Sequence, residues 1–138
     1  MAKDRFHQVV KTALAKEGWN ITHDPLKIKI GGVDMEIDLG AERLLAAERG
    51  DEKIAVEVKS FLASASAISE FHTTLGQFIN YRAALLLQEP NRILYLAVPE
   101  LAYNSFFQLD FPASMLQAHT VKMIVYNIEL EQISQWKH

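Results

Sequence analysis

The run Ile54-Ala55-Val56-Glu57-Val58-Lys59 most constrains the fold, because it places two opposite charges at the end of an apolar strand. Side chains two positions apart in a strand point to the same face, so Glu57 and Lys59 share one face and Val56 and Val58 share the other. A carboxylate and an ammonium group are costly to bury and need partners. The pattern therefore predicts either a structural ion pair or a site that uses both charges.

A second strand-like run, residues 33–39, contains Asp38 close to its end. If this strand neighbours the first one, the carboxylates of Asp38 and Glu57 converge and can bind a hard cation such as Mg²⁺ or Mn²⁺. The Lys59 ammonium group can then orient or activate a water molecule. Asp34 and Glu36 share the face of Asp38 and are alternative ligands, but Asp38 is favoured because it ends the strand. An exposed cross-strand ion pair is the usual meaning of Glu-x-Lys, so this pattern alone leaves both interpretations open.

Composition indicates one globular domain that spans residues 1–138. The chain is long enough for one hydrophobic core, and 49% of its residues are hydrophobic. There is no cysteine, which excludes disulfides and zinc–thiolate sites and fits a cytoplasmic protein. No apolar run is long enough to span a membrane, and the first residues do not resemble a signal peptide.

The charge balance limits how the chain can bind nucleic acid. Acidic residues outnumber basic ones by 17 to 14, the net charge is −3, and the basic residues are scattered. Proteins that bind DNA tightly are usually basic, because each phosphate contact needs a cation. We therefore expect the isolated chain to bind DNA weakly, and to need a second protein or self-association, such as a homodimer, for useful affinity.

The order of predicted elements indicates an α+β fold, with helices flanking one mixed sheet. Apolar spacing predicts a helix over residues 4–17, and Gly31-Gly32 predicts a hairpin between strands 26–30 and 33–39. Further strands are predicted over 53–59, 93–98, 121–126 and 129–136, with a second hairpin at residues 49–52. The 93–98 strand is almost wholly apolar, which is typical of a central strand covered on both faces.

A long helix is predicted over residues 67–88, with an apolar stripe that includes Phe71, Phe78 and Leu86. Gln77 and Tyr81 lie four residues apart and share a face beside this stripe. They either contact solvent or a partner, or are directed at the acids on the strands. The aromatic segment Tyr103–Phe111 is a candidate contact surface for a partner, although such residues more often pack in the core.

Six stretches, together with the Asp38…Glu57-x-Lys59 pattern, carry a resemblance to a known family. They are Phe6-His7-Gln8-Val9-Val10-Lys11, Ile21-Thr22-His23-Asp24-Pro25-Leu26, Ile37-Asp38-Leu39-Gly40-Ala41-Glu42, Ile54-Ala55-Val56-Glu57-Val58-Lys59-Ser60-Phe61, Leu75-Gly76-Gln77-Phe78-Ile79-Asn80-Tyr81-Arg82 and Ile93-Leu94-Tyr95-Leu96-Ala97-Val98-Pro99. The pattern resembles the PD-(D/E)xK nuclease superfamily, and the Gln-x-x-x-Tyr helix resembles its RecB-like branch. Over the stretches as a whole, the chain resembles the cyanobacterial fdxN element excision controlling factor family, XisH.

The resemblance implies a restriction-endonuclease-like mixed sheet and a divalent-metal-dependent DNA nuclease or nicking factor. Asp38 and Glu57 would be metal ligands, Lys59 the catalytic lysine, and Gln77, Tyr81 and the first-helix His7 auxiliary residues. It also implies excision of a DNA element during heterocyst development, alongside a separate site-specific recombinase and a small partner protein, XisI. A departure from the superfamily pattern is that no proline precedes Asp38. A non-catalytic accessory protein of the same fold, acting through a partner, is the alternative.

Overall fold

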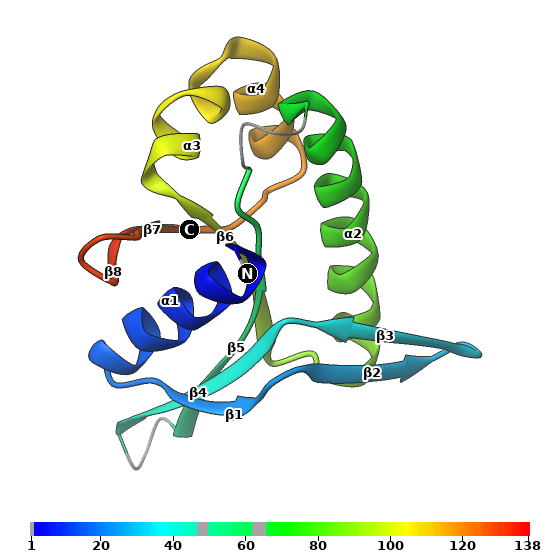
Figure 1. The fold of residues 1–138 in the computed structure, drawn as a ribbon. Helices are drawn as coiled ribbons and strands as arrows, with labels where there is room; N and C mark the ends of the chain where they lie inside the picture. The colour runs from blue at the N-terminus through cyan, green and yellow to red at the C-terminus, as the bar shows by residue number, and fades with distance from the viewer. Residues whose placement is uncertain (1, 47–49, 62–65) are drawn as a thin grey trace.

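The computed structural model describes residues 2–46, 50–61 and 66–138, and they form a mixed sheet with helices on both faces (Figure 1). In spatial order the six strands of the sheet are β1 (Asn20–His23), β4 (Leu39–Ala46), β5 (Gly50–Val58), β6 (Arg92–Pro99), β7 (Met123–Asn127) and β8 (Gln132–Lys137). Helix α1 (Ala2–Lys16) packs on one face and helix α2 (Ala67–Gln88) on the other. The predicted α+β class is confirmed.

Short elements complete the fold. Strands β2 (Leu26–Ile30) and β3 (Val33–Ile37) form a separate hairpin that packs against α2. Helix α3 (Glu100–Asn104), the 3₁₀ turn η1 (Phe106–Gln108) and helix α4 (Asp110–Ala118) connect β6 to β7. Among the described residues, no helix is both long enough and apolar enough to cross a membrane.

Local sequence explains where several elements end. Gly18 follows α1 with φ of +87°, a left-handed conformation that glycine adopts without steric cost, and the Trp19 N–H donates back to the Leu14 carbonyl at 3.1 Å. Gly31 and Gly32 both have positive φ and form the predicted two-residue turn between β2 and β3. The second predicted hairpin is present, because β4 and β5 pair antiparallel, but residues 50–52 of the predicted turn belong to β5, and residue 49 lies outside the described residues.

The middle of the sheet is parallel, because β6 pairs with β5 on one side and with β7 on the other in parallel register. Both faces of β6 are covered, as its apolar sequence predicts, although Ile93 is partly exposed. Alternation along β5 gives each face its own core. Val56 packs in the cluster on the α1 face and Ala55 in the cluster on the α2 face, so Glu57 points to the α2 side.

The strand predicted over residues 33–39 is in fact interrupted at Asp38. Strand β3 ends at Ile37 in the hairpin, and β4 begins at Leu39 in the six-stranded sheet. Asp38 is therefore the residue at which the chain passes from one sheet to the other. Because its backbone belongs to neither ladder, its N–H and its carboxylate are available for interactions with β5.

Candidate active site

Two hydrogen bonds link Asp38, just before β4, to the end of β5, one to the Glu57 carboxylate and one from the Val58 backbone. The Asp38 N–H donates to Glu57 Oε1 at 3.2 Å, and the Val58 N–H donates to Asp38 Oδ2 at 2.8 Å. The strand register, with Leu39 opposite Val56, brings the two carboxylates to the same end of the sheet. The structure therefore brings the Asp38 and Glu57 carboxylates close together, as the sequence predicts.

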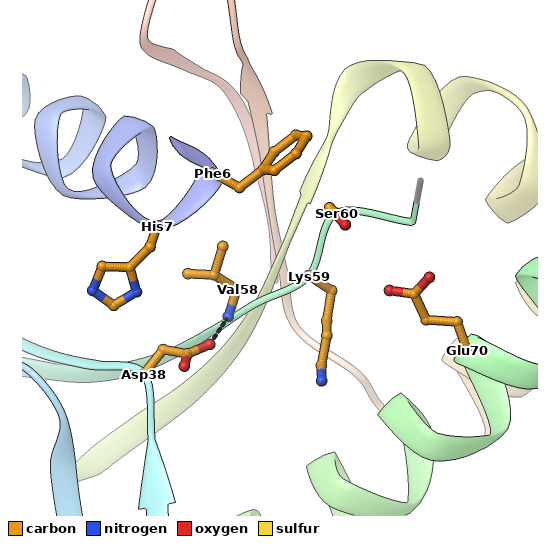
Figure 2. Close-up of a pocket in the computed structure, with 7 residues that line it drawn as sticks. All are labelled: Phe6, His7, Asp38, Val58, Lys59, Ser60 and Glu70. Atoms are coloured by element: carbon orange, nitrogen blue, oxygen red, sulfur yellow. Dashed lines mark hydrogen bonds between the residues drawn. The ribbon is translucent and has the colours of Figure 1, made fainter. Parts of the chain in front are cut away.

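Lys59 follows β5 directly and lies beside the two acids. Its Nζ atom is 3.6 Å from Glu57 Oε2, and its backbone N–H donates to the Ala97 carbonyl at 2.9 Å. Figure 2 shows its side chain extending between Asp38 and Glu70. Asp38 and Lys59, but not Glu57, line a cavity of about 250 Å³, whose lining residues are Phe6, His7, Asp38, Val58, Lys59, Ser60 and Glu70.

Burial makes Glu57 an unusual carboxyl group. Its exposed fraction is 6%, and it is one of three buried polar or charged residues among those whose burial is described, with Thr74 and Arg92. Burial, together with the negative charge of Asp38, raises the pKa of Glu57 from 4.5 to about 7, and the Lys59 ammonium group opposes the rise. Two carboxylates that repel one another in a partly dry site would be stabilised by a cation placed between them.

The raised pKa leads to a prediction about stability. Between pH 4.5 and pH 7 the folded protein binds a proton at Glu57 that the unfolded chain does not bind, so the free energy of unfolding decreases as the pH rises through this window. The expected decrease for the metal-free protein is about 2–3 kcal/mol. Urea unfolding at a series of pH values measures it. Glu57→Gln should flatten this part of the curve, and an unchanged slope in that variant would contradict the assignment.

His7 lies at the cavity but already has a partner. Its Nε2 atom is 2.7 Å from Asp24 Oδ1, and the Lys11 ammonium group is 2.8 Å from the other oxygen of the same carboxylate. Lys11 and His7 lower the pKa of Asp24 against the opposing effect of burial. Figure 2 shows the imidazole of His7 on the Asp38 side of the cavity. His7 therefore lines the site, but its ring is engaged by Asp24.

Gln77 and Tyr81 lie on α2 and line a different cavity, of about 500 Å³, between α2 and the β2–β3 hairpin. The Gln77 Oε1 atom is buried and has no hydrogen-bond partner in the described part of the chain. Burial raises the pKa of the Tyr81 phenol, and the charges of Glu57 and Asp38 raise it further. The two α2 residues thus flank the acids and do not line the cavity that contains Asp38 and Lys59.

Sequence reasoning did not identify Glu70 as a residue of the site. It lies in the first turn of α2, and its Oε1 atom accepts a hydrogen bond from the Phe61 N–H at 3.3 Å. The available signal was helical spacing, because Glu70 precedes Gln77 by seven residues and so shares its face. Across the described residues, no group of three or more histidine or carboxylate side chains has the arrangement of a complete metal site.

Comparison with known proteins places the chain in a family. The sequence matches the family described as XisH protein over residues 1–134. The crystal structure of an XisH family protein from Nostoc punctiforme PCC 73102 is 59% identical, with a TM-score of 0.90, and the match covers 98% of this chain and 100% of that chain. That of an fdxN element excision controlling factor protein from Anabaena variabilis is also 59% identical, with a TM-score of 0.91 and coverage of 98% and 99%. No curated protein matches the sequence. On the family match and these two structures, the chain belongs to the XisH family.

Proposed function

We propose that this protein is a divalent-metal-dependent DNA nuclease or nicking factor that supports excision of a DNA element. The observation that carries the proposal is that the Asp38 N–H donates to the Glu57 carboxylate and the Val58 N–H to the Asp38 carboxylate, with the Lys59 ammonium group 3.6 Å from Glu57. The excision role is taken from the Anabaena variabilis neighbour, which is described as an fdxN element excision controlling factor. The resemblance to PD-(D/E)xK nucleases supplies the reaction.

The donor set fits Mg²⁺ or Mn²⁺. Mg²⁺ is commonly bound by one or two carboxylates, retains several water molecules and takes further oxygen ligands from a phosphate. In these hydrogen bonds Glu57 accepts with Oε1 and Asp38 with Oδ2, so each carboxylate has a second oxygen for a cation, and that of Glu57 also lies 3.6 Å from the Lys59 ammonium group. Burial and the negative charge of Asp38 raise the pKa of Glu57 to about 7, so a cation between the two carboxylates would stabilise the ionised form of Glu57.

The residues divide the chemistry between them. A bound cation would polarise the scissile phosphate and lower the pKa of a coordinated water molecule. Asp38 and Glu57 hold the position for that cation. The positively charged Lys59 ammonium group stabilises the negative charge that develops on the phosphate oxygens in the transition state.

The first test is metal affinity. Asp38→Asn removes a charged ligand and should weaken Mn²⁺ binding, measured by isothermal titration calorimetry, by at least about tenfold. Asp34→Asn is the matched control, because Asp34 is an exposed aspartate in β3 that was an alternative ligand by strand alternation. The Mn²⁺ affinity of Asp34→Asn should stay within about twofold of that of the wild type. Equal loss in both variants, or no Mn²⁺ binding by the wild type, would contradict the proposed site.

A second candidate function is that of an accessory protein which retains the fold and acts through a partner. The favouring observation is that the segment connecting β6 to β7 carries exposed apolar side chains, with Leu101 82% exposed, Leu109 57% and Phe111 59%. Phe107, in the same segment, is buried, so the predicted contact surface Tyr103–Phe111 is divided between core and exterior. An XisI-type protein, and through it a site-specific recombinase, is the partner that the family resemblance suggests.

Charge leads to a prediction about DNA affinity. With a net charge of −3, the isolated chain should bind duplex DNA with a Kd no tighter than about 1 µM near physiological salt. Fluorescence anisotropy with a labelled duplex measures this, with and without an XisI-type partner. The affinity should increase when the partner is present or when the chain self-associates. Nanomolar binding by the chain alone would contradict the prediction.

A further inference from the structure

Lys59 lies at the end of the parallel ladder between β5 and β6, where β6 has no backbone N–H to donate to the Lys59 carbonyl. The Lys59 N–H donates to the Ala97 carbonyl, which continues the register that pairs Val58 with Ala97. In a parallel ladder the next hydrogen bond runs from the residue two beyond Ala97 back to the Lys59 carbonyl. That residue is Pro99, which has no N–H to donate.

A tyrosine hydroxyl takes the place of the missing backbone donor. Tyr126, on β7, donates from its hydroxyl to the Lys59 carbonyl at 3.2 Å. Its side chain is fully buried in the cluster on the α1 face, and its ring packs edge-on against Phe6 at 6.4 Å. Burial raises the pKa of Tyr126 far above its ordinary value, so the hydroxyl keeps its proton and remains a donor at any working pH.

The segment after Lys59 has a second attachment. Phe61 has φ of +50°, a left-handed conformation that is uncommon for a bulky residue, and its N–H donates to Glu70 at 3.3 Å. Its ring packs against Phe107 at 4.9 Å. The backbone conformation therefore changes at Phe61, two residues after Lys59, and the Tyr126 hydroxyl fixes the Lys59 carbonyl just before this point.

We propose that Tyr126 is a positioning residue for Lys59, whose hydroxyl fixes the lysine backbone where Pro99 cannot do so. The proposal rests on the proposed function insofar as Lys59 stabilises phosphate charge. The position of the Lys59 ammonium group beside Glu57 can be measured in a crystal structure, whether or not the protein cleaves DNA.

The test uses Tyr126→Phe, which removes only the hydroxyl group. The matched control is Tyr95→Phe, because Tyr95 lies in the same buried cluster and its hydroxyl is hydrogen-bonded to His138 at 2.9 Å, away from Lys59. Crystal structures of both variants give the distance from Lys59 Nζ to Glu57 Oε2, which is 3.6 Å here. We expect it to increase by about 1 Å or more in Tyr126→Phe, and to stay unchanged in Tyr95→Phe.

Activity provides the second measurement. Tyr126→Phe should lower kcat for Mg²⁺-dependent DNA cleavage by about tenfold or more, with KM and Mn²⁺ affinity within about twofold of the wild type, because Asp38 and Glu57 are unaffected. Tyr95→Phe should cleave like the wild type. A general loss of stability would instead affect both variants and Mn²⁺ binding as well.

A rescue variant separates positioning from packing. Pro99→Ala restores a backbone N–H, and Pro99 has φ of −71° and ψ of 153°, which alanine can adopt. In the Tyr126→Phe background it should return Lys59 to its place and recover most of the lost kcat. An unmoved Lys59 in Tyr126→Phe, or a double variant no closer to the wild type than the single one, would overturn the inference. If the wild type does not cleave DNA, the proposed nuclease function fails, and the crystal structures still decide the position of Lys59.

Discussion

Lys59→Ala is expected to lower Mg²⁺-dependent nicking of supercoiled DNA to background, a loss on the order of 10²–10³-fold, while the protein remains folded. The lysine lines the cavity that contains Asp38, and its ammonium group lies 3.6 Å from Glu57 without filling a core position. Removing it takes away charge stabilisation on the phosphate but leaves the strand pairing of β5 intact. Mn²⁺ binding should persist, because both carboxylates remain.

Lys53→Ala is the matched control for this experiment. Lys53 lies on β5, the strand that Lys59 follows, and points to the same face, but it is six residues away, opposite Glu42 and Arg92 in the register. It should retain wild-type nicking activity. Gln77→Ala should have a smaller effect than Lys59→Ala, because Gln77 lines the neighbouring cavity. Equal nicking by the wild type and Lys59→Ala would point to a contaminating nuclease or to a different site.

Phe71→Ala is expected to destabilise the protein by about 3–5 kcal/mol, since it removes a large buried side chain and leaves a cavity. Phe71 is 1% exposed and packs edge-on against Phe106 and Phe107, with ring centroids 5.6 Å and 6.0 Å away. These rings also support Phe61, so the variant should loosen the segment that follows Lys59. Urea unfolding followed by circular dichroism measures the free energy change.

Phe111→Ala tests whether this cost depends on burial rather than on residue type. Phe111 is 59% exposed at the start of α4, so its truncation should change the free energy of unfolding by less than about 1 kcal/mol. If the accessory function holds, Phe111→Ala should instead weaken binding of an XisI-type partner. Comparable destabilisation by Phe71→Ala and Phe111→Ala would show that the aromatic cluster is packed differently from this structure.

Strand alternation in the sequence predicted that Glu57 and Lys59 share a face, and the hairpin signals together with alternation predicted that Asp38 lies near them. The same local reasoning placed the hairpin at Gly31-Gly32 and the central strand over residues 93–98. A glycine pair is typical of a two-residue hairpin turn, and an unbroken apolar run is typical of a strand covered on both faces. It was less reliable for α2. Leu86 was expected in the buried stripe but is 67% exposed, whereas Leu85 is buried. Helical periodicity fixes a face only to within about one residue.

The sequence by itself therefore determined the chemical groups of the site and the α+β class of the fold. Tertiary structure decided how those groups are held. The chain passes from one sheet to the other at Asp38. The hydrogen bonds between His7 and Asp24 and from Tyr126 to Lys59 join residues that are far apart in the chain. Such contacts depend on which strands become neighbours, because hydrogen bonds act only over about 3 Å and local patterns do not specify partners at that range.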